Sequence, residues 1–92
     1  ARPEEGQDGA IVTLTMTRAA NNRVTVSQPV VYPTWVDKRS GYTIRNLSAD
    51  LAQASAVEAG IASSRWSAEL ASLRRTRKIL GDTYLVPGPY LK

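Results

Sequence analysis

The stretch that decides the fold is Ala10-Ile11-Val12-Thr13-Leu14-Thr15-Met16-Thr17-Arg18. Apolar side chains alternate with threonines along it, and a period of two rich in β-branched residues is typical of a half-buried strand. Residues 23–28 repeat the pattern, and the intervening Ala19-Ala20-Asn21-Asn22 suits a tight turn because asparagine tolerates positive φ. The two runs predict a β-hairpin. Its buried face is expected to hold Val12, Leu14, Met16, Val24 and Val26, with the threonines more exposed.

Two prolines mark the region after the hairpin. Pro29 and Pro33 lack the N–H that a β-ladder requires, so residues 30–32 are expected to form an edge strand or to lie near a bulge. Residues 34–37 should continue extended, and residues 38–41 should turn. Residues 42–47 are rich enough in β-forming residues to predict a third, short strand.

The second half of the chain has helical periodicity. Ser48 is a candidate N-cap, and the spacing of Leu51, Val57 and Ile61 predicts a helix that ends at Gly60. A second helix should begin near Ser63 or Ser64 and end at a Gly81 cap. Its apolar stripe is expected to consist of Trp66, Leu70, Leu73 and Leu80.

The tail, residues 82–92, holds two prolines and a glycine and is expected to be an extended docking segment. The predicted fold class is therefore α+β, with an N-terminal β-hairpin, a third strand, two helices and an extended C-terminal tail. Residues 1–9 are expected to be a linker or loop, and residues 10–92 a single small unit.

Composition limits the chemistry of the chain. Among its 92 residues there is neither histidine nor cysteine. Nucleophile–base catalysis normally needs a base such as histidine beside the nucleophile, and thiolate metal sites and disulfides need cysteine. None of the glycine-rich phosphate-binding fingerprints appears. No apolar stretch approaches the roughly 20 residues of a membrane span, and no signal peptide is recognised. The chain alone is therefore expected to be no enzyme and to hold no cofactor.

The formal net charge is +4, and the second predicted helix is its most basic part. A basic helix after a short one permits a helix-turn-helix that binds DNA, or simply a solvated helix face. If Gly60 marks the turn, the inward positions Ser55 and Glu69 should be apolar, and both are polar. We therefore expect no specific nucleic-acid recognition. The aromatic residues Tyr32 and Trp35 fit either a ligand shelf or the core. The candidate interaction surface comprises Tyr32, Trp35, Arg74, Arg75, Arg77 and Lys78.

Several segments occur in the order found in a known family. Residues 9–18, the asparagine turn and residues 23–26 resemble the late hairpin of the capsule-synthesis or poly-γ-glutamate biosynthesis proteins, which are CapA-like members of the calcineurin-type metallophosphoesterase superfamily. Tyr32-Pro33-Thr34-Trp35-Val36-Asp37-Lys38-Arg39 is similar to a Val-Pro-Thr-(Trp/Tyr)-Val-Asp-Arg segment of the same proteins. Residues 42–47 and 67–81 resemble their following strand and closing helix.

The resemblance covers residues 9–81 and implies a specific role. In that family the metal-binding motifs, of the Gly-Asn-His-Asp and Gly-His-x-His kinds, lie earlier in the chain, and this sequence contains none of them. The resemblance thus implies a C-terminal portion that adds strands to the catalytic sheet and covers it with helices. It also implies divalent metals in the parent protein, a cell-envelope or extracellular location, and an anionic polymer as a candidate partner.

Three functional hypotheses follow. The first is this non-catalytic C-terminal portion, whose partner is the preceding region of the same protein. The second is a small DNA-binding regulator that uses the basic helix, residues 64–80. The third is a free-standing accessory protein whose hairpin edge recruits a partner strand. The chain begins at Ala1, which fits methionine removal or an internal fragment. Because the apolar hairpin face exceeds what two such helices cover, the piece alone is expected to be marginally stable or self-associated.

Overall fold

A three-stranded antiparallel sheet forms the centre of the molecule. The computed structural model describes residues 5–91. The strands β1 (Asp8–Thr13), β4 (Val30–Asp37) and β5 (Thr43–Asn46) lie in the order β1-β4-β5. Short 3₁₀ turns, η1 (Glu5–Gln7) and η2 (Lys38–Ser40), precede β1 and join β4 to β5. The predicted linker lies partly outside the described residues, and its last two residues, Asp8 and Gly9, begin β1 instead.

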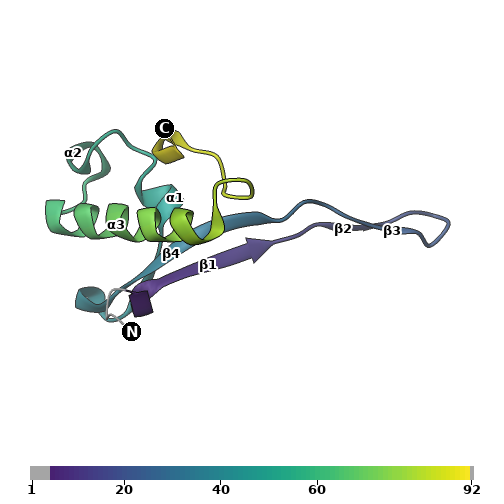
Figure 1. Ribbon diagram of the computed structural model, residues 1–92, viewed down its shortest axis with the longest axis horizontal. Helices are drawn as coiled ribbons and strands as arrows, with labels where there is room; N and C mark the ends of the chain where they lie inside the picture. The colour runs from purple at the N-terminus through teal and green to yellow at the C-terminus, as the bar shows by residue number, and fades with distance from the viewer. Residues whose placement is uncertain (1–4, 92) are drawn as a thin grey trace.

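Beyond the sheet, the chain continues as a two-stranded arm, which we define as residues 14–29. It contains β2 (Met16–Arg18) and β3 (Val24–Val26), and it projects well past the helices (Figure 1). The longest dimension of the molecule is 53 Å, against 31 and 25 Å for the others. At the tip, Asn22 adopts the expected positive φ of 64°. The alternating pattern therefore forms one long hairpin whose base belongs to the sheet and whose end stands free.

The hairpin prediction was correct in pairing but wrong in burial. Met16 lies directly opposite Val26, and Arg18 opposite Val24, so the apolar residues of the two runs share a face as expected. That face is exposed, however, because the helices of this chain do not extend along the arm. The exposed residues include all five that were expected in the core: Val12, Leu14, Met16, Val24 and Val26.

The arm and the sheet are separated by a β-bulge. Between the pairs Thr13–Val30 and Met16–Val26, the first strand has two residues (14 and 15) and the returning strand has three (27–29). One extra residue on the returning strand is the signature of a bulge, which increases local twist. Pro29 lies within it, where the missing N–H costs no ladder bond. The expected bulge near the prolines is thus confirmed.

The expected edge strand is in fact the central one. β4 pairs with β1 along residues 30–35 and with β5 along residues 34–37. The β4–β5 ladder begins at Thr34, one residue after Pro33, so the proline is tolerated in a central strand. Toward the start of β4, the tail replaces β5 as the neighbour of this strand. The Val31 N–H donates to the Tyr84 carbonyl, and the Val86 N–H donates to the Val31 carbonyl.

The first predicted helix is broken into two single turns, α1 (Leu47–Asp50) and α2 (Ala56–Ala59). Asn46, rather than Ser48, caps α1 by accepting from the Ser48 and Ala49 N–H groups. Ser55 adopts an extended conformation and caps α2, because its hydroxyl satisfies the Glu58 N–H locally and competes with a continuous helix. Gly60 ends α2 in the left-handed conformation, as expected.

The second predicted helix forms as α3 (Ser63–Leu80), with Gly81 at its end. Leu73 is buried, but Leu80 is exposed, and the buried face of α3 consists mainly of polar residues: Glu69, Ser72 and Thr76. The tail then docks on the body through Leu85, which forms a parallel bridge with Val31, and ends in η3 (Pro89–Leu91). The α+β class, with strands followed by helices and a docked tail, is confirmed.

The core lies between one face of the sheet and the helices. Trp35 of β4 packs with Leu47, Leu51 and Leu73, and Trp66, Leu70 and Tyr90 cover its margin. The helices α1, α2 and α3 and the tail lie on this side of the sheet (Figure 1). The helices form one layer on one face of the sheet, so they do not cover its other face.

Candidate interaction surface

The second face of the sheet is apolar and open. Ile11 lies opposite Tyr32 and Ile44 opposite Val36, and the pleat places these four on the face away from Trp35. Ile11 is 53% exposed and Ile44 is 67% exposed, while Tyr32 and Val36 are half-buried. We call these four residues the open sheet face. An antiparallel sheet with one face toward water normally carries polar side chains there, and these positions are apolar.

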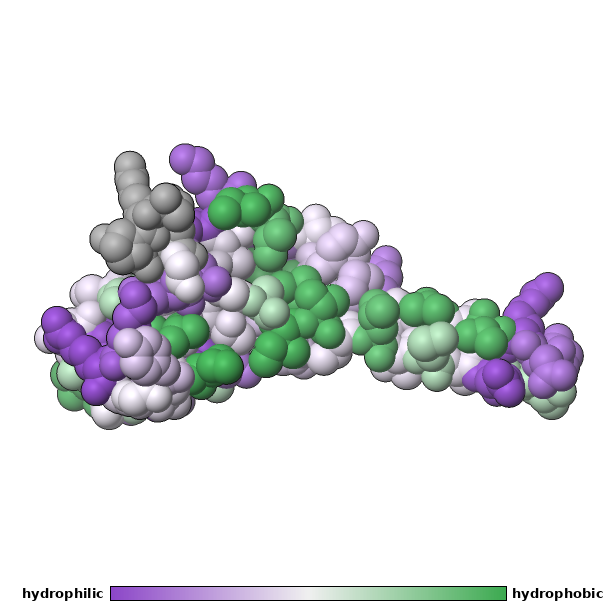
Figure 2. Space-filling view, turned by 90° about the horizontal axis from the view of Figure 1, so that it is seen from below, coloured by the Kyte–Doolittle hydropathy of each residue, from purple (hydrophilic) through white to green (hydrophobic). Residues whose placement is uncertain are grey.

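The arm carries a second apolar surface. Leu14, Met16, Val24 and Val26, which we call the arm stripe, are between 45% and 69% exposed. Viewed from below, hydrophobic residues gather on the body and continue along the arm (Figure 2). Between Gly9 and Val36 the sequence has no acidic residue, and its cations in that range, Arg18 and Arg23, flank the turn at the tip. The arm is therefore an apolar ribbon with a positively charged end.

Among residues 5–91, nothing gives the outer edge of β1 the usual protection. Natural edge strands are shielded by lysine, proline, a bulge or a covering segment. β1 has the sequence Asp-Gly-Ala-Ile-Val-Thr, and every residue from Gly9 to Thr13 is exposed. Within residues 5–91 no strand pairs with this edge. Its backbone groups are thus available to another strand.

The two aromatic candidates lie on opposite faces of β4. Tyr32 belongs to the open sheet face, where it is half-buried and lies opposite Ile11 in the ladder. Trp35 is 8% exposed and packs in the core beneath the helices, so it offers little surface to a partner. The pleat alternates side chains between faces, so a residue three positions from Tyr32 had to point the other way.

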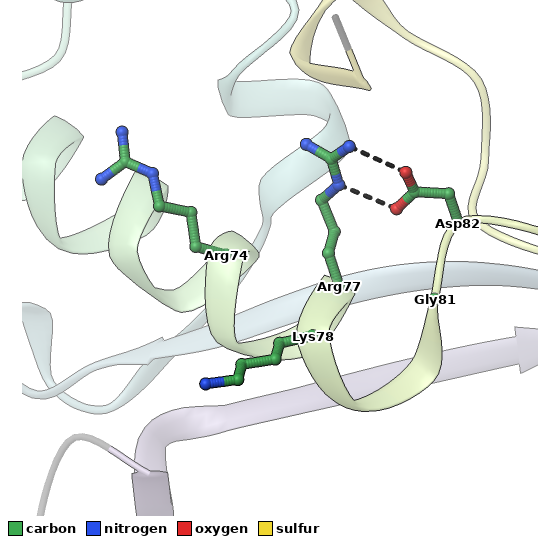
Figure 3. Close-up of a pocket in the computed structure, with 5 residues that line it drawn as sticks. All are labelled: Arg74, Arg77, Lys78, Gly81 and Asp82. Atoms are coloured by element: carbon green, nitrogen blue, oxygen red, sulfur yellow. Dashed lines mark hydrogen bonds and ion pairs between the residues drawn. The ribbon is translucent and has the colours of Figure 1, made fainter.

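The four basic candidates do not converge. A shallow hollow at the end of α3 is lined by Arg74, Arg77, Lys78, Gly81 and Asp82, and the three cations in it point in different directions (Figure 3). Arg77 makes two hydrogen bonds to the Asp82 carboxylate, both of 2.8 Å, and donates to the Tyr90 carbonyl. The two hydrogen bonds from Arg77 to its carboxylate hold the pKa of Asp82 below its usual 3.8. Arg77 thus helps to fix the tail.

Arg75 connects α3 to the first strand. It donates from Nε and an NH₂ group to Asp8 at 2.7 and 2.9 Å, and the Ser72 hydroxyl donates to the same carboxylate at 2.6 Å. Burial raises the pKa of Asp8, but Arg75 and Ser72 outweigh it and hold the pKa below 3.8. Sequence reasoning missed this contact because its partners are 64 to 67 residues apart and no local pattern joins them.

The described part of the chain offers no metal centre. Among residues 5–91 there is no group of three or more histidine, cysteine, aspartate or glutamate side chains placed to hold an ion. Nor does any helix in that range combine the length and hydropathy that crossing a membrane requires.

Comparisons with models of known protein families, with curated proteins and with solved structures give no match to this chain. The resemblance to the CapA-like proteins therefore stays a prediction.

Proposed function

We propose that this chain is a non-catalytic structural portion of a CapA-like capsule or poly-γ-glutamate biosynthesis protein. Its role is to pack against the preceding region of that protein, to extend the catalytic sheet and to cover it. The observation that carries the proposal is the open sheet face together with the unprotected edge of β1. Contiguous exposed apolar surface on a small protein marks a contact site, and a bare edge accepts a further strand.

Both features fit a single neighbour. A strand added beside β1 extends the sheet, and a layer packed below it covers Ile11 and Ile44 at the same time. The arm stripe then continues the contact beyond the body. With no histidine in the sequence, the proposed role leaves the divalent-metal ligands to the preceding region. The same proposal assigns the parent protein to the cell envelope, with an anionic polymer as its candidate partner.

The DNA-binding alternative gains no support from the geometry. A helix-turn-helix needs two full helices that cross. The helix before α3 is α2, which spans only four residues and is too short to serve as the first of them. Arg75 and Arg77 are held by Asp8 and Asp82. The accessory-protein alternative uses the same edge as the proposed function. The length of the natural reading frame separates the two, because a gene of only these residues has no preceding region to bind.

The test is binding in trans. The preceding region, produced as a separate chain, should bind the 92 residues in isothermal titration calorimetry and raise their melting temperature. Ile44→Ser, on the open sheet face, should weaken binding by about tenfold or more, because each buried large apolar side chain contributes about 1.5–3 kcal/mol. Ile79→Ser is the matched control, since Ile79 is equally apolar and exposed but lies on α3.

Two results would overturn the proposal. One is a preceding region that fails to bind the folded wild-type chain at any concentration tested. The other is equal weakening by Ile44→Ser and Ile79→Ser, which would move the contact away from the open sheet face. Binding by a strand of unrelated origin, with a reading frame of only these residues, would favour the accessory protein instead.

A further inference from the structure

A buried acidic residue joins α1 to α3. Glu69 of α3 is 0% exposed, and Arg65, one turn earlier, donates from Nε to Glu69 Oε2 at 3.1 Å. The same guanidinium lies 3.7 Å from Oδ2 of Asp50, the last residue of α1. One arginine thus lies between two carboxyl groups on different helices.

Each of the two carboxyl groups has one oxygen that accepts no hydrogen bond from residues 5–91. These atoms are Glu69 Oε1 and Asp50 Oδ2, and both are buried. Leaving a buried acceptor unsatisfied is costly, and a bare buried charge costs more. Arg65 contacts both carboxyl groups, and a hydrogen bond between Glu69 and Asp50 is among the causes that raise the pKa of Glu69. A single proton placed between them turns one acceptor into a donor and satisfies both oxygens.

The charges around Glu69 do not balance two carboxylates. On α3 the neighbouring cation is Arg65, and on α1 the neighbour is Asp50. From α2, Glu58 lines the same hollow as Asp50 and Arg65, but it is exposed, so solvent screens its charge. On the strand side, Asp37, Lys38 and Arg39 share a second hollow with Arg65, and Asp37 is paired with Arg45. Burial, and next the hydrogen bond and charge of Asp50, raise the pKa of Glu69 to about 8 against the opposing effect of Arg65.

We propose that Glu69 keeps its proton in the folded chain and donates it to the Asp50 carboxylate, and that this hydrogen bond is a pH-sensitive contact between α1 and α3. Loss of the proton to water leaves two charged carboxylates, that of the fully buried Glu69 and that of the half-buried Asp50, with Arg65 as their shared cation. Their repulsion acts directly on α1, a four-residue turn that is also held by Leu47 and Leu51 in the core. The expected outcome is loosening of the segment 47–60, which includes α1 and α2, while the sheet persists.

The direction of the pH dependence follows from the proton. The folded chain keeps it up to a higher pH than the unfolded chain, in which Glu69 has its ordinary pKa of 4.5. The contribution to stability is therefore complete below about pH 4.5 and is lost progressively as the pH rises to about 8. The ion pairs of Asp8, Asp37 and Asp82 with arginines act in the opposite direction, because the pKa of each of these aspartates is lowered.

The experiment compares two Glu→Gln variants of the 92-residue chain in urea unfolding between pH 5 and 9.5. For the wild type, the unfolding equilibrium constant should rise by at least about tenfold across this range. Glu69→Gln keeps a donor toward Asp50 and an acceptor toward Arg65 but does not titrate, so its profile should be flat. Glu58→Gln makes the same chemical change at an exposed position and should keep the wild-type slope.

A second measurement keeps the test decisive if Glu69→Gln fails to fold. Carbon-13 NMR of side-chain carboxyls in the wild type should show Glu69 titrating near pH 8, and Asp50→Asn should lower that midpoint. A Glu69 midpoint below 5 would overturn the proposal. So would a Glu69→Gln variant that retains the full pH slope of the wild type.

Discussion

Leucine occurs in both the body and the arm of this molecule, in contrasting surroundings. Leu47 lies in α1, is 0% exposed, and packs in the core with Trp35 and Leu73. Leu14 lies where β1 passes into β2 and is 56% exposed, although it sits in the most regular apolar alternation of the sequence. The comparison teaches that alternation assigns side chains to a common face, whereas coverage of that face depends on what other segments reach it.

The largest expected effect is at the centre of the body. Leu47→Ala should destabilise the chain by about 2–5 kcal/mol, because it removes a fully buried side chain and leaves a cavity. Leu14→Ala makes the same chemical change in the arm and should alter the free energy of unfolding by no more than about 0.5 kcal/mol. Urea unfolding of both variants measures the difference. Equal losses would show that the arm is covered in solution, for example by a second copy.

A smaller effect is expected where the body holds the base of the hairpin. Asp8→Asn should cost about 1–2 kcal/mol, since it removes the charge that Arg75 and Ser72 hydrogen-bond. Because the pKa of Asp8 is lowered, its contribution is present above pH 3.8 and is lost as the pH falls through the lowered value. Acid titration monitored by tryptophan fluorescence should therefore show a shallower acid loss in Asp8→Asn than in the wild type. Asp82→Asn removes a carboxylate whose pKa is also lowered but whose ion pair is exposed, so it should change the acid limb less than Asp8→Asn does.

The smallest effect is expected at the tip of the arm. Asn22 has φ of 64°, which asparagine and glycine adopt more readily than alanine does. Asn22→Ala should reduce the population of paired β2 and β3 while Asn22→Gly preserves it, and neither should move global unfolding by more than about 0.5 kcal/mol. Cross-strand nuclear Overhauser effects between Thr17 and Thr25, which lie opposite one another, report the pairing. A large global loss in Asn22→Ala would show that the arm and the body unfold together.

The sequence predicted the candidate interaction surface only in part. The residues of the arm stripe were correctly identified as one face, but that face was expected to be buried and is exposed. Tyr32 was placed on the interaction surface and lies on the open sheet face. Trp35 joined the core because the pleat turns it toward the helices, and the basic residues of α3 are divided between ion pairs and solvent. Glu69 was counted as polar at an inward position, but the sequence offered no sign of its partner on α1.

The sequence by itself determined the features that depend on neighbours within a few residues. These are the strands of period two, the pairing across the asparagine turn, the helix ends at Gly60 and Gly81, and the absence of imidazole and thiol chemistry. The tertiary structure decided that β4 is central, which sheet face the helices cover, and that Asp8 meets Arg75 across 67 residues. Backbone periodicity and turn chemistry are local, so a sequence reveals them directly. The coverage of a sheet face and the pairing of buried charges arise only when segments distant in the sequence pack together. No local pattern indicates which segments will do so.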